Sequence, residues 1–365
     1  MKKRTLALVL TLAMSLALLL SACGDTGSNS GSNGGTTGGD SAQNEGEDTG
    51  GNPDASGGTI KIICPYGVGG TADAIGRKFA LVANKTHPEY NFIVENMTGG
   101  DGFAAADYFT DQDPSTKELL VYGYGVAYRH DLGKKYGTEV VDFDREDIYP
   151  IAAIDDRTWI LYSTPDVTLA DVIAKAQEGG IKMSGGNPLS DPHLALGSLM
   201  TQMGGKVMVV PYDGGAAQKK GLTDGEVDVF VGTTQAAQDE VEAGTLIPIL
   251  AFSENTFEGF TTPNGAISVP SIAGSGMAPE LDSSKDFTGS ILRGGGYIAT
   301  RTGADQAWID EMVQISKDVW ADPEYSDWIA SILLNKFEEY GEDAVAGLNQ
   351  ACEKAVAAYD LMSAG

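Results

Sequence analysis

From residue 59 onward, short apolar runs rich in Val and Ile alternate with segments of helical spacing, and glycine occurs at many of the junctions. The runs 59–64 and 91–95 flank a helical segment over 71–83. Strands that alternate with helices predict an α/β fold with largely parallel sheets. Further strands are expected at 119–124, 148–154, 159–162, 207–210, 227–231 and 247–252, and helices near 102–110, 168–178, 192–203, 214–222, 234–243 and over most of 304–364.

The N-terminus reads as an export signal followed by a tether. A basic start precedes the apolar run 5–20, which has the length of a signal peptide, and the run ends in Leu20-Ser21-Ala22-Cys23. This ending resembles the lipobox of bacterial lipoproteins, which implies a signal peptide over 1–22 and a lipid on Cys23. The alternative is an ordinary signal peptide with an incidental cysteine. Residues 24–58 contain no Val, Ile, Leu, Phe, Tyr or Trp, so we expect 23–58 to be a lipidated cysteine and a disordered tether.

Length, charge and residue counts exclude several classes of function. A chain of 365 residues suggests two domains of ordinary size or three small ones, and 51 acidic against 24 basic residues leave a formal charge of −27. That sign excludes a nucleic acid partner and disfavours an anionic membrane surface. With three histidines and no cluster of ligands in the sequence, we expect neither a metal nor a cofactor. Cys64 and Cys352 can form one disulfide or remain buried thiols, and we expect the thiols.

Two glycine-rich turns follow the first two predicted strands. The first contains Gly69, Gly70, Thr71 and Asp73, and the second is Met97-Thr98-Gly99-Gly100. The first turn matches G-x-G-x-x-A, the pattern of a dinucleotide site, but a proline breaks the junction and the chain is exported. Main-chain N–H groups at a helix N-terminus can instead hold a carboxylate without a basic side chain. Since ligands of open α/β sheets sit at the carboxyl ends of the strands, both turns should face one site.

Two further turns carry small polar residues before helices. One runs from Ser184 and Gly185 to Ser190 and His193, with Asp191 as the expected cap and Pro192 as the first helical residue. For His193 the sequence allows a ligand donor or a structural hydrogen bond. The other turn is 210–215, which includes Tyr212 and Gly214.

These motifs, in this order, resemble the substrate-binding proteins of tripartite tricarboxylate transporters, the Bug or TctC-like family. The resemblance rests on Pro65-Tyr66 with Gly69-Gly70-x-x-Asp73, on Val94-Glu95-Asn96, on the Ser184 to His193 segment, on Val210-Pro211-Tyr212 with Gly214, and on Gly225-x-Val227-Asp228. It covers residues 59 to about 360. Departures occur at Asp213, where the family has a basic residue, in the second loop, and in the long polar segment 256–286.

The resemblance implies a two-lobed clamshell of the type II periplasmic-binding-protein kind, crossed twice by the chain. The expected lobes are 59–160 plus 251–365, and 161–250. Ligand contacts carried over from the family are Tyr66, Gly69, Gly70, Thr71, Asp73, Thr98 and Gly99 in the first lobe, and Ser184, Gly185, Ser190, His193, Tyr212 and Gly214 in the second. The aromatic residues Tyr66, Phe103, Tyr124, Tyr128 and Trp159 can line the pocket or belong to the core.

The implied function is that of a lipid-anchored extracytoplasmic receptor, held at the cell membrane, that presents a small organic solute, expected to be a carboxylate, to the membrane permease of a tripartite tricarboxylate-type transporter. A sensor that reports ligand occupancy to a two-component system would use the same chemistry. A surface hydrolase using Ser184 or Ser190 with His193 is disfavoured, because no G-x-S-x-G elbow precedes a Ser-His-Asp order. We therefore expect a binding protein and not an enzyme.

Overall fold

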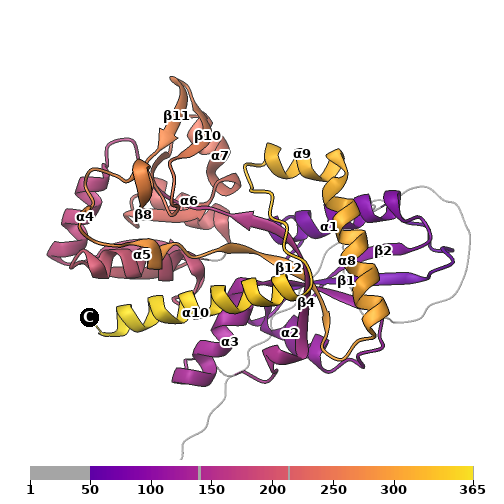
Figure 1. Cartoon of the computed structure of the whole chain (residues 1–365). Helices are drawn as coiled ribbons and strands as arrows, with labels where there is room; N and C mark the ends of the chain where they lie inside the picture. The colour runs from indigo at the N-terminus through magenta and orange to yellow at the C-terminus, as the bar shows by residue number, and fades with distance from the viewer. Residues whose placement is uncertain (1–49, 139–140, 213, 365) are drawn as a thin grey trace, which may run out of the picture. The chain divides into compact units, whose positions relative to one another are not determined.

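Two five-stranded sheets organise the part of the chain that the structure, a computed structural model, describes: residues 50–138, 141–212 and 214–364 (Figure 1). One sheet has the order β2-β1-β3-β12-β4 and the other β7-β6-β8-β5-β9, while β10 and β11 form a separate hairpin. The strands are β1 (Thr59–Cys64), β2 (Asn91–Asn96), β3 (Glu118–Gly123), β4 (Ile148–Arg157), β5 (Trp159–Ser163), β6 (Ile181–Gly185), β7 (Val207–Pro211), β8 (Val229–Thr233), β9 (Ile247–Ala251), β10 (Phe257–Thr262), β11 (Gly265–Val269) and β12 (Gly294–Arg301).

Helices follow most of these strands, as the alternating pattern predicted. They are α1 (Thr71–Thr86), α2 (Phe103–Thr110), α3 (Tyr124–Tyr136), α4 (Leu169–Glu178), α5 (Asp191–Gln202), α6 (Gly215–Thr223), α7 (Gln238–Glu242), α8 (Gln306–Ala321), α9 (Pro323–Ser331) and α10 (Glu342–Ala364). Helix α9 starts at Pro323, whose fixed φ suits a first helical position, and the Asp322 side chain caps it. Helix α5 starts one residue earlier than the sequence suggested, since Ser190 is its cap and Asp191 its first residue.

Each sheet contains one strand that opposes its neighbours. Strand β12 pairs antiparallel with β3 and β4, and β5 pairs antiparallel with β8 and β9, whereas the β1 and β6 pairs are parallel. Only Thr158 separates β4 of the first sheet from β5 of the second. The reversed strands are those at which the chain arrives from the other sheet. A strand that enters at the carboxyl edge must run back against its neighbours, so each sheet has four strands in one direction and one against them.

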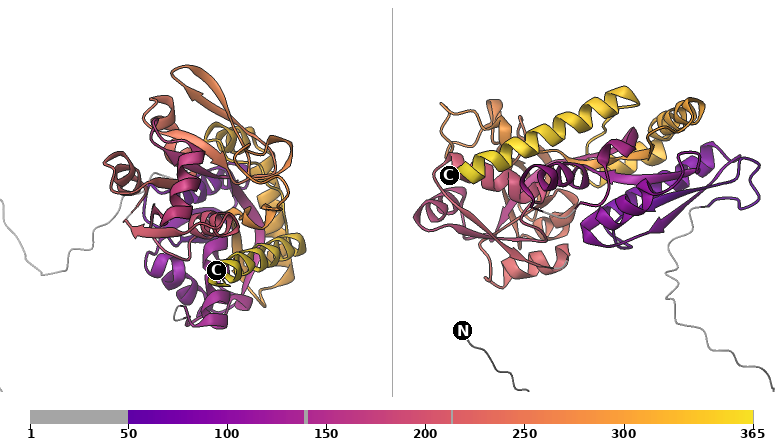
Figure 2. Two further views of the ribbon diagram at one scale, coloured as in Figure 1. Left: turned by 90° about the vertical axis from the view of Figure 1, so that its left-hand side faces the viewer. Right: turned by 90° about the horizontal axis from the view of Figure 1, so that it is seen from below.

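The core joins both sheets through shared apolar residues. One buried cluster contains Leu120 and Tyr297 from the first sheet together with Met183 and Val229 from the second. Helix α10 contacts α3 and β4 of the first sheet and α5 beside the second. Figure 2 shows this long C-terminal helix, coloured yellow. Cys64 and Cys352 are buried and free, which confirms the prediction of thiols.

The sequence did not indicate α3, β12 or the β10–β11 hairpin. Helix α3 buries residues on several sides, including Tyr124, Tyr128 and Arg129, so it lacks the one-sided apolar spacing by which a surface helix is recognised. Strand β12 begins with three glycines, a residue that sequence rules count against a strand. In the described part of the chain, no helix is both long and apolar enough to cross a membrane.

Candidate functional site

The first glycine turn leads from β1 to the N-terminus of α1. Gly69 takes φ of 80°, which glycine adopts without steric cost, and Gly70 caps α1 from an extended conformation with no side-chain hydrogen bond. The carboxylate of Asp73 accepts from the main-chain N–H of Gly69 at 2.9 Å. It also accepts from Arg77 Nε at 3.1 Å and from Asn96 Nδ2 at 2.7 Å. Asp73 therefore stiffens the turn, and the first N–H groups of α1 remain available to a ligand.

Burial raises the pKa of Asp73, but its hydrogen bonds to Arg77, Asn96 and Gly69 outweigh that effect, so the pKa lies below its ordinary value. A carboxylate whose pKa is lower in the folded than in the unfolded state stabilises the fold. The stabilisation is complete at pH values above the unfolded-state pKa, and it is lost as the pH falls through the folded-state pKa. Asp73 is therefore ionised at neutral pH. Its negative charge in the first turn of α1 also interacts favourably with the positive end of the helix dipole.

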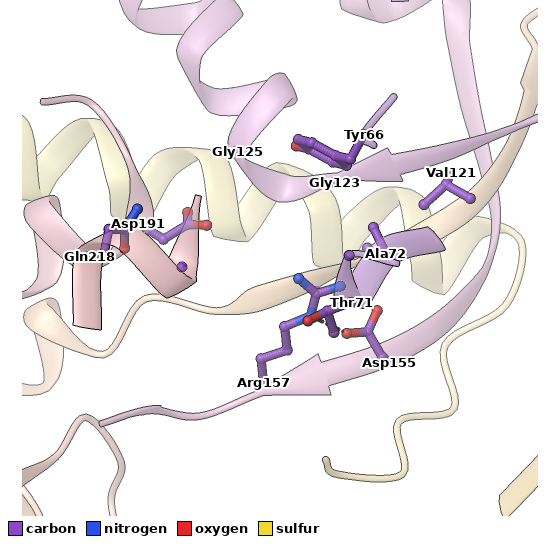
Figure 3. A pocket seen from close by; sticks show the side chains of 14 residues that line it. Tyr66, Thr71, Ala72, Val121, Gly123, Gly125, Asp155, Arg157, Asp191 and Gln218 are labelled. Carbon is purple, nitrogen blue, oxygen red and sulfur yellow. Dashed lines mark hydrogen bonds and ion pairs between the residues drawn. The ribbon is translucent and has the colours of Figure 1, made fainter. Parts of the chain in front are cut away.

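A cavity of about 410 Å³ opens beside this turn (Figure 3). Its lining comes from strands of the first sheet, from the starts of α1 and α3, and from α5 and α6, which follow strands of the second sheet. The lining residues are Tyr66, Gly70, Thr71, Ala72, Val121, Gly123, Gly125, Asp155, Arg157, Asp191, Gly215, Gln218, Gly295 and Gly296.

Helix N-termini dominate this lining. Among the described residues, α1 contributes Gly70 to Ala72, α3 contributes its cap Gly123, α5 begins at Asp191 and α6 begins at Gly215. None of the four caps makes a side-chain hydrogen bond. Each helix N-terminus carries roughly half a positive charge and unpaired N–H donors. The four ends together can hold a carboxylate.

Arg157 is the cation of the cavity. It lies at the end of β4 and forms an ion pair with the fully buried Asp155. Burial opposes the charge on Arg157, but Asp155 raises its pKa above the ordinary value, and burial raises the pKa of Asp155. Figure 3 shows the side chains of Arg157, Thr71 and Asp155 grouped at one end of the cavity. A planar guanidinium in this position can bind a carboxylate beside the N-terminus of α1.

Asp191 lies across the cavity from Arg157, near Gln218 (Figure 3). Burial raises the pKa of Asp191 to about 7, although the Tyr128 hydroxyl and Arg157 pull it downward. Tyr128 Oη donates to the carbonyl of Leu189 at 2.8 Å, and this contact holds the start of α5 against α3. Asp191 therefore keeps its proton to a higher pH than an exposed aspartate does.

A second cavity of about 840 Å³ adjoins the first and shares Tyr66, Gly70 and Gln218 with it. Its remaining lining residues are Gly67, Val68, Asp101, Gly186, Asn187, Pro211, Tyr212 and Gly214. Asp101 forms an ion pair with Arg129 Nη1 at 3.0 Å. The turn from Ser184 to His193 and the turn 210–215 thus meet the first glycine turn at one opening.

Only part of the expected site lines these cavities. Tyr66, Gly70, Thr71, Tyr212 and Gly214 do so. Expected residues outside both linings are Gly69, Asp73, Thr98, Gly99, Ser184, Gly185, Ser190 and His193. Of the aromatic candidates, Tyr66 alone lines one of these two cavities, whereas Tyr124, Tyr128 and Trp159 are buried in the core and Phe103 packs against it.

Ser184 and His193 are buried and line neither cavity. Ser184 is fully buried, and His193 places Nδ1 against the carbonyl of Pro188. Burial lowers the pKa of His193, with the Pro188 carbonyl opposing that shift, so the ring is neutral at physiological pH. Within the described residues, Ser184 Oγ and His193 Nε2 have no hydrogen-bond partner, so the two side chains do not bond to each other. The hydrogen bond of His193 is therefore the structural one.

Sequence reasoning missed Arg157, Asp155 and the glycines of β12, and it treated Asp191 only as a cap. Arg157 and Asp155 lie at the end of the long strand β4. Side chains of a strand alternate between its two faces, and the sequence does not tell which face of β4 lines a cavity. No local pattern therefore marks these two residues as part of a site. Within the described ranges, no group of three or more His, Cys, Asp or Glu side chains is arranged to hold a metal ion. Cys23, the expected lipidation site, lies outside the described residues.

Comparison with known proteins agrees with the sequence motifs. A family model described as the tripartite tricarboxylate transporter family receptor matches residues 81–266, about half of the chain. A UPF0065 protein from the TAR-I ttuE-ttuC' intergenic region of Agrobacterium vitis is 27% identical over 196 residues, which are 50% of this chain and 55% of that protein. Another UPF0065 protein, from the Tohama I strain of Bordetella pertussis, is 26% identical over 194 residues, 51% of this chain and 57% of that protein. The chain spans about half the length of these relatives.

Solved structures share the fold. Rpa4515 of R. palustris with adipate has a TM-score of 0.67 at 17% identity, over 84% of this chain and 97% of that one. MatC from Rhodopseudomonas palustris with bound malate has a TM-score of 0.64 at 14% identity, over 83% and 98%. A TctC solute binding protein from Polaromonas gives 0.59 at 19% identity, over 84% and 98%. These likenesses confirm the α/β fold of the periplasmic-binding-protein type. With the family model matching half of its length, the chain belongs to the tripartite tricarboxylate transporter receptor family, a family of binding proteins and not of enzymes.

Proposed function

We propose that this protein is an extracytoplasmic solute-binding protein that holds a small organic carboxylate in the 410 Å³ cavity and delivers it to a tripartite tricarboxylate-type permease. The observation that carries the proposal is the convergence of four helix N-termini and Arg157 on one cavity. Such donors lie within hydrogen-bond reach of a ligand, whereas the many surface acids are screened beyond about 8 Å at physiological salt. An acidic protein can therefore bind an anion.

The family membership and two neighbours support a carboxylate. Rpa4515 was solved with adipate and MatC with malate, and both have the fold of this chain. Hydrogen bonds to a charged group contribute about 1.5–3 kcal/mol each, so a few of them, after the cost of ordering the ligand, reach micromolar affinity, or about −8 kcal/mol.

The lobes of the proposed receptor are residues 59–160 with 251–365, and residues 161–250. This division is supported by the two sheets, because β1 to β4 and β12 form one and β5 to β9 form the other. Ligand would bind between the lobes and favour the closed arrangement, since a ligand shifts a conformational equilibrium by its differential affinity for the two states. The wall contacts expected from the sequence, Gly70 and Thr71 opposite Tyr212 and Gly214, belong to different lobes in this division.

Membrane attachment would come from a lipid on Cys23, supported by the Leu20-Ser21-Ala22-Cys23 pattern after an apolar run. A Cys23→Ala variant made in a bacterial host should incorporate no labelled fatty acid and should leave the membrane fraction, whereas the unchanged chain should be labelled and retained. Equal membrane retention of the two chains without label would contradict lipid anchoring.

Binding is tested with the purified folded chain and a panel of mono- and dicarboxylates that includes adipate and malate. We expect a raised melting temperature and a calorimetric isotherm for at least one compound, with the compound recovered unchanged. Arg157→Gln should weaken that binding at least tenfold, because it removes a charged donor from the cavity. The absence of any carboxylate binder, or chemical turnover of the compound, would overturn the proposed function.

A further inference from the structure

The charges that line the 410 Å³ cavity do not match a simple dianion. Among the described residues, its charged side chains are Arg157, Asp155 and Asp191, one base and two acids. Arg157 and Asp155 already form an ion pair, so their charges largely cancel. Asp191 remains as an additional carboxyl group, in contact with the Tyr128 hydroxyl, and Arg157 acts on it only through space. A ligand with two carboxylates would bring its second negative charge towards an acidic wall.

The Arg157–Asp155 pair keeps an unused acceptor. Asp155 Oδ1 is buried and has no hydrogen-bond partner within the described part of the chain, while the other oxygen contacts Arg157. A buried acceptor without a donor costs free energy. Oδ1 is closed off from the cavity by its burial, so this pair offers a ligand the N–H donors of Arg157.

The cation and the second acid of the cavity lie at opposite ends. Arg157, Thr71 and the N-terminus of α1 form one end, where a carboxylate fits, and Asp191 and Gln218 form the other (Figure 3). The carboxylate of Asp191 accepts hydrogen bonds when ionised, whereas the side-chain amide of Gln218 both accepts and donates. The second end is therefore built for a hydrogen-bond donor, most strongly for a cationic one.

We propose, resting on the function proposed above, that the ligand of this cavity is a zwitterion, a carboxylate that also carries a protonated amine. Its carboxylate binds Arg157 and the N-terminus of α1, and its ammonium group binds Asp191. The ammonium group neutralises Asp191, whose carboxylate would repel the second carboxylate of a dicarboxylate. A hydroxyl group in the same place donates a hydrogen bond to Asp191 but carries no positive charge. The cavity thereby selects amines over hydroxyls and carboxylates on the same carbon skeleton.

The test compares matched compounds that differ only at one group. Three series serve: succinate, 4-hydroxybutyrate and 4-aminobutyrate; adipate, 6-hydroxyhexanoate and 6-aminohexanoate; propionate, lactate and alanine. The dissociation constant of each compound is measured by calorimetry with the purified folded chain. In the series that binds most tightly, we expect the amine to bind at least about tenfold more tightly than its partners, the gain of one charged hydrogen bond.

Variants separate the two ends of the cavity. Asp191→Asn keeps an acceptor oxygen but removes the charge, so it should abolish the preference for the amine and leave the affinity for the hydroxy acid within about twofold. Asp191→Glu should restore part of the preference. Asp111→Asn, an exposed acid at the end of α2, is the control and should change nothing. Melting curves of each variant show that it is folded.

The outcomes distinguish this inference from the proposed function. If carboxylates bind but the diacid or the hydroxy acid of a series has the same dissociation constant as the amine, the zwitterion proposal is overturned and the receptor proposal stands. Should no compound of any series bind, both proposals fall. An amine preference that survives in folded Asp191→Asn would also overturn the assignment of the ammonium group to Asp191.

Discussion

Gly69 and Gly70 are neighbours with different physical roles. Gly69 needs the left-handed φ of 80°, and a Cβ on it would meet nothing within 4 Å. Gly70 has φ of −75° and ψ of 162°, which any L-residue adopts, but it lines both cavities. The first glycine is required by the backbone, and the second leaves the main-chain donors of α1 open to a ligand.

The pair allows a clean substitution test. Gly70→Val should leave the chain folded and weaken carboxylate binding at least tenfold, because its side chain would obstruct the N–H groups of Thr71 and Ala72. Gly69→Ala should instead lower the free energy of unfolding by about 1–2 kcal/mol through its left-handed φ, with affinity largely kept. Calorimetry and urea unfolding measure the two effects. Undiminished affinity in Gly70→Val would exclude this turn from the binding site.

At the scale of elements, strand β12 lines the cavity with main-chain atoms, because its residues there are glycines. It enters the first sheet between β3 and β4, antiparallel to both, and its glycines Gly295 and Gly296 line the cavity. A Cβ on Gly296 would approach the carbonyl oxygen of Tyr122 to 2.8 Å. The glycines let three strands pack closely at the point where α3 and the cavity begin.

Gly296→Ala should therefore destabilise the fold. Because the clash is with backbone, the strands must shift, and we expect a loss of about 1–3 kcal/mol in the free energy of unfolding. The control is Gly289→Ala, at a position where a Cβ meets nothing within 4 Å, with an expected change within about 0.5 kcal/mol. Chemical denaturation compares the two variants, and equal stabilities would contradict the packing role assigned to Gly296.

At the scale of the whole described unit, a few hydrogen bonds connect elements of the two sheets beside the cavity. Thr71 Oγ1, at the start of α1, donates to Gln235 Oε1 at 2.8 Å, just after β8 of the other sheet. Tyr128 of α3 similarly reaches the carbonyl of Leu189 before α5. These contacts join the two walls that a solute would have to touch together.

Gln235→Ala removes one of these connections without removing a cavity-lining residue. Under the proposed function this contact joins the two lobes in their closed arrangement, which the ligand favours. Loss of a neutral hydrogen bond of about 1 kcal/mol from that arrangement should lower solute affinity about fivefold. Gln238→Ala is the matched control, because the side-chain amide of Gln238 donates to the exposed Glu242 on its own helix. An affinity equal to that of the unchanged chain would show that the Thr71–Gln235 contact plays no part in holding the solute.

Local sequence patterns determined much of this protein. Alternating apolar runs predicted most strands and helices, Asp322-Pro323 marked the start of α9, and the ordered glycine motifs indicated the family. Tertiary structure decided the order of strands, the reversal of β5 and β12, and the charged side chains of the cavity. The reason is range: capping, turns and periodicity act between residues a few positions apart, whereas Thr71, Arg157 and Asp191 meet only because the chain passes from one sheet to the other and back.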